Sequence, residues 1–169
     1  MSFPSDISLG VAKAVFVLLE NDIDLNKQHE LNVPNILGGA YVEGVRKYDE
    51  DPSIQARVNE IANNLYTNTP SVELAKFNQG KLLNIAAFEL VLKKLGSSIP
   101  ADNFIYESEA GKVGKELVIK NIPNVFTESE GAVVYIPNES KKNLNTAVFI
   151  NSQGNPTYEA KDLGLLKMK

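Results

Sequence analysis

The sequence predicts an α/β fold, and three features indicate it. Residues 35–95 carry apolar side chains at helical spacing and show no strand pattern. Residues 132–136 and 146–151 are rich in apolar and β-branched side chains, and the polar loop between them predicts a long-looped hairpin. After a turn at residues 152–156, helical periodicity returns and continues to the last residue.

The first helix is expected over residues 9–20. Val11, Val15 and Leu18 fall at helical spacing there, so they would share one face. Residues 21–31 are polar and are expected to form a loop. Three residues ahead of the helix can cap its N-terminus: Ser5, Asp6 and Ser8.

Three further helices are expected in the block that follows. One covers residues 35–48, and the next begins at Pro52, because proline is tolerated in a first helical turn. The third covers residues 71–95, with a break expected near Gly80 and a stop at Gly96. Beyond this block we expect a short strand and a short helix before the hairpin, over residues 104–106 and 111–122.

Composition and charge narrow the class of protein. The 169 residues are 43% hydrophobic, which is enough for a real core. The net charge of −4 argues against a dedicated nucleic-acid surface, since phosphate binding needs positive charge. Without cysteine, disulfides and thiolate metal sites are excluded. The longest apolar run, residues 14–19, is too short to span a bilayer, and no signal-peptide pattern precedes it, so we expect no membrane contact and a cytoplasmic location.

Most polar motifs favour a structural interpretation. His29, the single histidine, lies in a polar stretch without an evident partner, so solvent exposure is favoured over a nucleophilic site. The glycines at 38–39 and 111–115 lack the spacing of a phosphate loop. The acidic run 49–51 is typical of a solvated turn. The carboxylates at 107–109 and 128–130 are typical of turns and helix caps beside strands. No residue is therefore assigned as catalytic, and none as a metal ligand.

Tyr158 and Asp162 are the most informative pair. They are four residues apart on the last expected helix, so they lie on one face, one turn apart. A carboxylate matches the two-pronged geometry of a guanidinium, and a phenol hydroxyl adds a hydrogen bond. The pair also follows a strand, and ligands bind at the carboxyl ends of strands in open α/β sheets. Alone, a Tyr-x-x-x-Asp pair is common, and a purely structural role stays open.

Four segments together resemble the arginyl-tRNA synthetases over nearly the whole chain. These segments are NVPNILGGAYVEGVRKYDEDPSIQ, FIYESEAGKVGKELV, TESEGAVVYIP and VFINSQGNPTYEAKDLGLLKMK. Their order and spacing are similar to those of the family, and the last, with its Tyr-x-x-x-Asp-Leu helix, is the most specific.

The resemblance implies a partial Rossmann-like class I synthetase catalytic domain with a helical inserted segment. Residues 1–34 would be the N-terminal helix and loop of the catalytic core, 35–95 the helical insertion, and 96–169 the α/β part of the core, ending in a truncated helix. Such enzymes activate arginine with ATP, accompanied by Mg²⁺, and transfer it to tRNA(Arg). The resemblance implies that Tyr158 and Asp162 bind the arginine side chain.

Two family motifs are absent from these residues. The His-x-Gly-His and Lys-Met-Ser-Lys motifs that handle ATP do not occur, and residues 5–10 depart from the family pattern. The ATP-binding residues are therefore unknown, and most tRNA contacts are expected elsewhere. We expect an internal segment that is inactive alone. The alternatives are a truncated, non-catalytic paralogue that binds arginine or a partner protein, and a hydrolase that depends on His29.

Overall fold

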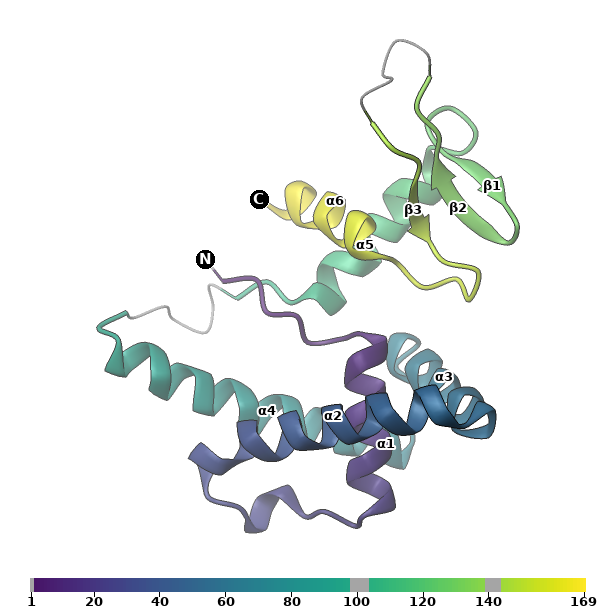
Figure 1. Cartoon of the computed structure of the whole chain (residues 1–169). Helices are drawn as coiled ribbons and strands as arrows, with labels where there is room; N and C mark the ends of the chain where they lie inside the picture. The colour runs from purple at the N-terminus through teal and green to yellow at the C-terminus, as the bar shows by residue number, and fades with distance from the viewer. Residues whose placement is uncertain (1, 98–103, 139–143) are drawn as a thin grey trace. The chain divides into compact units, whose positions relative to one another are not determined.

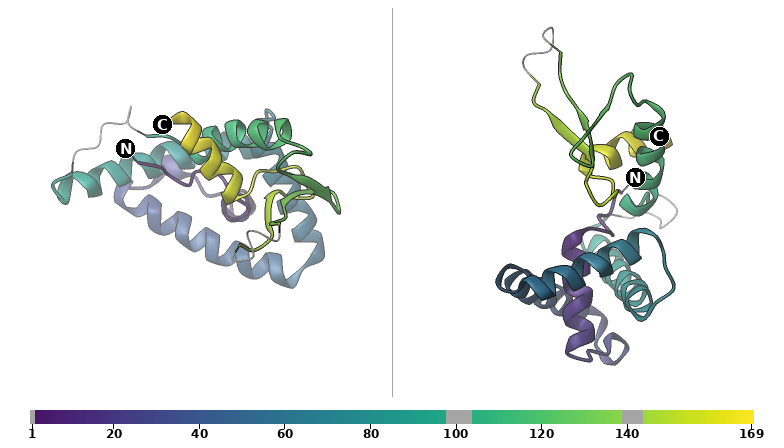
Figure 2. Two further views of the ribbon diagram at one scale, coloured as in Figure 1. Left: turned by 90° about the horizontal axis from the view of Figure 1, so that it is seen from above. Right: turned by 90° about the vertical axis from the view of Figure 1, so that its right-hand side faces the viewer.

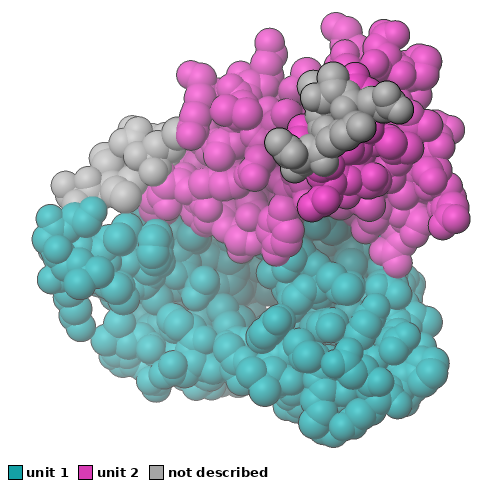
Figure 3. All heavy atoms as spheres, turned by 45° about the horizontal axis from the view of Figure 1, so that its top comes forward, with its two compact units in different colours: residues 1, 6–103 teal, residues 2–5, 104–169 magenta. Residues whose placement is uncertain are grey.

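The computed structural model describes all residues except 1, 98–103 and 139–143, and it divides into two compact units. The first unit lies within Asp6–Asn103, and the second combines Ser2–Ser5 with Phe104–Lys169 (Figure 3). Together they contain helices and a small antiparallel sheet, so the predicted α/β class is confirmed at this coarse level. The division of the sequence into a catalytic core and an insertion stays a prediction.

Helices make up the first unit (Figure 1). Short 3-10 turns at Leu25–Lys27 and Glu30–Asn32 occupy the stretch that was expected to be a loop. The helices match the predicted positions closely: α1 (Leu9–Glu20), α2 (Val33–Glu50), α3 (Pro52–Tyr66) and α4 (Val72–Lys94).

Side-chain caps explain where three of these helices begin. The Ser8 hydroxyl accepts from the Val11 amide at 3.2 Å, so Ser8 is the cap among the three candidates. The Asp51 carboxylate accepts from both the hydroxyl and the amide of Ser53, and these bonds lower the pKa of Asp51. Ser71 caps α4 in the same way as Ser8 caps α1.

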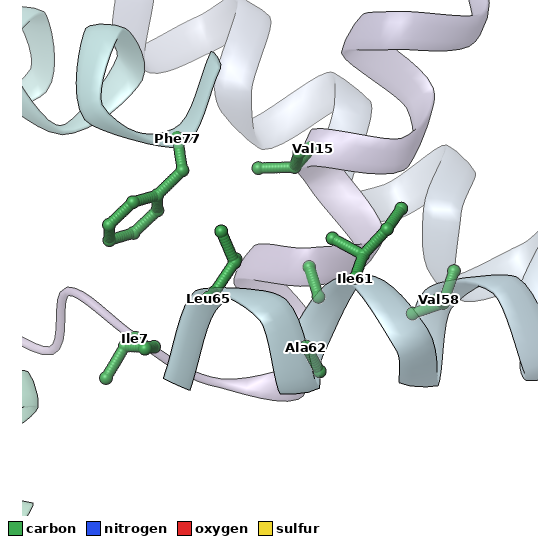
Figure 4. Close-up of a cluster of buried hydrophobic side chains, with 8 residues drawn as sticks. Ile7, Val15, Val58, Ile61, Ala62, Leu65 and Phe77 are labelled. Atoms are coloured by element: carbon green, nitrogen blue, oxygen red, sulfur yellow. The ribbon is translucent and has the colours of Figure 1, made fainter. Parts of the chain in front are cut away.

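Helix α1 is buried on two sides. One face contributes Val15 to a cluster with Ile61 of α3 and Phe77 of α4, which Figure 4 shows in close-up. The other face contributes Leu18 to a second cluster with Leu25. At the crossing of α1 and α2, a Cβ on Gly44 would lie 2.5 Å from the Lys13 carbonyl oxygen. Glycine is therefore needed at position 44 for the two backbones to approach.

The break that was expected in α4 near Gly80 is wrong, because the helix runs through it unbroken. Gly80 is buried, and a Cβ there would make ordinary contacts of 3.6 Å with Leu25 and Leu37. A glycine in a helix interior costs about 1 kcal/mol relative to alanine, which tertiary packing readily offsets. Gly96, with a φ of +74°, follows the last turn as predicted.

A partly buried ion pair joins α3 to the start of α4. Glu73 is buried and pairs with Arg57, whose guanidinium also donates to Glu60. The pKa of Glu73 is lowered, first by a hydrogen bond from its own backbone amide and then by Ser71 and Arg57. The pKa of Arg57 is raised, mainly by Glu60. Both groups thus keep their charge at neutral pH.

The second unit packs helices on a three-stranded sheet (Figures 1 and 2). Strand β2 (Ala132–Tyr135) pairs antiparallel with both neighbours, with Glu128 opposite Val133 and Val133 opposite Ile150. Val133 and Ile150 face a cluster that includes Val118 and Ala160. The elements are α5 (Glu107–Lys120), β1 (Thr127–Ser129), β2 (Ala132–Tyr135), β3 (Ala147–Ile150) and α6 (Tyr158–Met168).

Several expectations for this unit need correction. Residues 104–106 form no strand: Phe104 makes one isolated bridge to Ser2, and α5 begins at Glu107 rather than at 111. Strand β1 was not predicted, because its side chains are all exposed and leave no alternating pattern. The β2–β3 hairpin is confirmed, although residues 139–143 of its loop lie outside the described residues. All pairings in the described sheet are antiparallel, so a Rossmann-like domain is not confirmed.

In the described ranges of the chain, no helix combines the length and the apolar character that a bilayer crossing requires. This finding agrees with the apolar runs of the sequence, which are all short.

Candidate functional site

The turn before α6 is held by a network of hydrogen bonds. The Asn151 side-chain oxygen accepts from the amides of Gln153 and Asn155, at 3.1 and 2.9 Å. Gly154 has a φ of +77°, a conformation that favours glycine, and its carbonyl accepts from the Lys115 ammonium at 2.6 Å. The turn is therefore fixed to itself and to α5.

Thr157 connects this turn and β3 to the first residue of α6. Its hydroxyl donates to the Val148 carbonyl at 2.6 Å, and its amide donates to the Phe149 carbonyl at 3.0 Å. Its own carbonyl accepts the helical bond from the Lys161 amide. The residue before α6 is thus attached to β3 through its hydroxyl and its amide, and to the first turn of the helix through its carbonyl.

Tyr158 and Asp162 lie one turn apart on α6, as the sequence predicted. Both are exposed, and Tyr158 keeps 64% of its surface accessible. The sheet before them is antiparallel, so the rule for ligand sites at the carboxyl edge of parallel sheets does not apply to this unit. The two side chains therefore form an open face, here called the Tyr158–Asp162 face.

Lys161 lies between these two residues in sequence, but its side chain is buried. Its ammonium is 2.8 Å from the Glu107 carboxylate, and the two side chains are 3% and 8% exposed. The same nitrogen lies 5.1 Å from the centre of the Tyr158 ring. The fold thus places a buried, paired cation next to the Tyr158–Asp162 face.

The α5–α6 crossing determines which side of α6 is buried. A Cβ on Gly114 would lie 1.7 Å from the Ala160 carbonyl oxygen, and one on Gly164 would lie 1.8 Å from the Ala110 carbonyl oxygen. Such distances are far inside contact range, so only glycine permits the two backbones to approach this closely. Because Ala160 and Gly164 face α5, the helix has a defined rotation about its own axis.

The other polar candidates have structural roles in the described residues. His29 is exposed, as predicted, and its Nδ1 accepts from the Leu31 amide at 3.3 Å. The glycines at 38–39 and 111–115 lie inside α2 and α5 rather than in loops. In the acidic run, Asp51 caps α3 and Glu50 pairs with Arg46 at 2.6 Å.

The carboxylates next to the strands separate into two kinds. Glu109, Glu128 and Glu130 are exposed, while Glu107 is buried with Lys161. Among the described residues, no group of three or more histidine, aspartate or glutamate side chains is placed to hold a metal ion.

Sequence reasoning missed the Glu107–Lys161 pair. One local signal pointed to it: Lys161 is next to Ala160 and three residues before Gly164, both of which lie on the buried side of α6. A lysine on such a side needs an anionic partner, because an unpaired buried charge is costly. The partner itself is 54 residues away, which no local pattern reveals.

Comparison of the sequence with models of known protein families gives no match, and comparison with curated proteins gives no relative.

Proposed function

We propose that this chain is a segment of an arginine–tRNA ligase and that it carries part of the pocket for the arginine side chain. The proposal is supported by the four motifs that resemble arginyl-tRNA synthetases in order and spacing. The observation that carries it is the common open face that Tyr158 and Asp162 share on α6.

The chemistry of this face suits a guanidinium. A carboxylate offers two oxygens to the parallel N–H donors of arginine, whereas the ammonium of lysine is only a point charge. We assign the guanidinium contact to Asp162 and a hydroxyl contact to Tyr158. An exposed ion pair is worth no more than about 1 kcal/mol, so strong binding requires further residues that enclose Asp162 and exclude water from it.

The residues that would shield Asp162 from water, and those that would bind ATP, are proposed to lie outside this chain. A class I catalytic domain also needs parallel strands, which would have to be supplied in the same way, since the described sheet is antiparallel. ATP with Mg²⁺, most tRNA(Arg) contacts and a cytoplasmic location belong to the proposed complete enzyme. Catalysis requires ATP to be positioned and its charge stabilised, so residues 1–169 alone are expected to be inactive.

The test is ATP–pyrophosphate exchange by the complete gene product that contains these residues. We expect exchange to depend on arginine and not on lysine, and residues 1–169 alone to give no exchange. Exchange by the complete product that is indifferent to arginine would contradict the proposal. Arginine binding without any exchange would favour the non-catalytic paralogue instead.

A further inference from the structure

We infer that Glu107 is a specificity-determining positioning residue, because it neutralises the Lys161 ammonium that the fold buries beside the Tyr158–Asp162 face. The inference rests on the proposed function, since it concerns the cationic side chain that this face would bind. Its physical basis is repulsion between like charges. The face proposed to bind a guanidinium lies next to a second cation, the Lys161 ammonium, on the same helix.

The position of Lys161 is fixed by packing. Its stem passes over Gly111 of α5, where a Cβ would lie 3.4 Å from the Lys161 Cγ atom and 3.1 Å from a ring carbon of Pro156. A side chain that is 3% exposed is held away from bulk water. The ammonium therefore cannot move into solvent to escape the field of a bound guanidinium.

Glu107 is well placed to cancel this charge. It is the first residue of α5, where the positive end of the helix dipole favours a carboxylate. Its own amide donates to the Pro4 carbonyl at 3.1 Å, which ties the backbone at this point to the N-terminal segment. The anion is thus held at a fixed distance from Lys161, and the pair is close to neutral as seen from Tyr158.

Loss of the Glu107 charge would leave a net positive charge beside the face. Two like unit charges several ångströms apart in a partly buried site repel enough to change an equilibrium by about tenfold. The repulsion acts on the guanidinium of arginine, whereas ATP binds at a separate end of the proposed active site. The effect should therefore appear in the KM for arginine and not in the KM for ATP.

The test compares two variants of the complete gene product, Glu107→Gln and the double variant Glu107→Gln/Lys161→Met. Glutamine keeps the size and a hydrogen-bond acceptor, and methionine keeps the length of the lysine stem over Gly111. We expect Glu107→Gln to raise the KM for arginine about tenfold, with kcat and the KM for ATP within about twofold. The double variant should return the KM for arginine to within about threefold of the wild type.

Uncharged citrulline separates electrostatics from structure, because the double variant removes an unpaired buried charge and would recover under either explanation. If the pair only holds α5 against α6, Glu107→Gln will weaken the binding of arginine and of citrulline equally, whereas charge repulsion weakens the binding of arginine alone. Equal weakening, or an unchanged KM for arginine in Glu107→Gln, would overturn the inference while leaving the proposed function intact. Exchange that never depends on arginine would instead overturn the proposed function, and this inference with it. Circular dichroism of both variants checks that they fold.

Discussion

Replacing Gly114 by alanine is expected to destabilise the second unit by about 3 kcal/mol or more, because overpacking against a rigid neighbour exceeds the usual range of core strain. The added Cβ would lie 1.7 Å from the Ala160 carbonyl oxygen. The carbonyl oxygen belongs to the backbone, and the position of a Cβ is set by the backbone, so neither atom can rotate away. The helices must separate, and separation exposes the cluster that Val118 and Ala160 form with the sheet.

Gly38→Ala is the matched control for this prediction. Gly38 also lies inside a helix, but nothing is within 4 Å of a Cβ built there. Alanine should stabilise α2 by roughly 0.5–1 kcal/mol, since it loses less backbone entropy on folding. Urea unfolding gives the overall change, and hydrogen exchange of the α5 and α6 amides reports the second unit separately. Equal effects of the two substitutions would contradict the close crossing of α5 and α6.

Asp162→Asn is expected to raise the KM for arginine about thirtyfold or more in the complete gene product. Asparagine has the shape of aspartate but no charge, so one member of a desolvated charge pair is removed. Losses of this kind cost on the order of 2–5 kcal/mol. The KM for ATP should stay within about twofold, because the proposed ATP end of the site lies outside these residues.

Glu159→Gln provides the control for net charge. Glu159 is an exposed acid on the same turn of α6, so its replacement removes the same charge from the same region. It lies three residues before Asp162 and is therefore a neighbour on the helix surface, but it is not assigned to the guanidinium contact, and an exposed charge is screened by solvent. We expect less than a threefold change in the KM for arginine. A change below threefold for Asp162→Asn, or equal changes for both variants, would count against the assigned guanidinium contact.

The helices of the first unit could be predicted because their signals are local. Ser8 and Ser71 accept from amides three residues ahead, and Asp51 with Pro52 begins α3. Caps of this kind act within one turn and need no tertiary contact to be recognised. Gly96 ends α4 for an equally local reason, its positive φ.

The errors arose where distant contacts decide the structure. Gly80 stays helical at a buried position next to Leu25 and Leu37. Phe104 makes one isolated bridge to Ser2, which is far away in sequence, and residues 104–106 do not continue it as a strand. The three-residue β1 has no buried side chain, so only its pairing with β2 marks it as a strand. Periodicity cannot report any of these contacts.

In the candidate site, too, the sequence predicts what depends on local spacing but not what depends on distant contacts. The common face of Tyr158 and Asp162 follows from helical spacing alone, and it stands in the structure as expected. The buried Glu107–Lys161 pair depends on how α5 crosses α6, which in turn depends on Gly114 and Gly164. A sequence contains those glycines but does not say which helices they bring together.

The central claim is that the Asp162 carboxylate reads the positive charge of arginine, and citrulline tests it most directly. Citrulline has the length and shape of arginine, with a neutral group in place of the guanidinium. The measurement is the ratio of the citrulline inhibition constant to the KM for arginine, in the wild-type complete gene product and in Asp162→Asn. We predict a wild-type ratio of about thirty or more, from a charge pair worth at least about 2 kcal/mol, and a ratio near one in the variant. A ratio that Asp162→Asn leaves unchanged would contradict the claim.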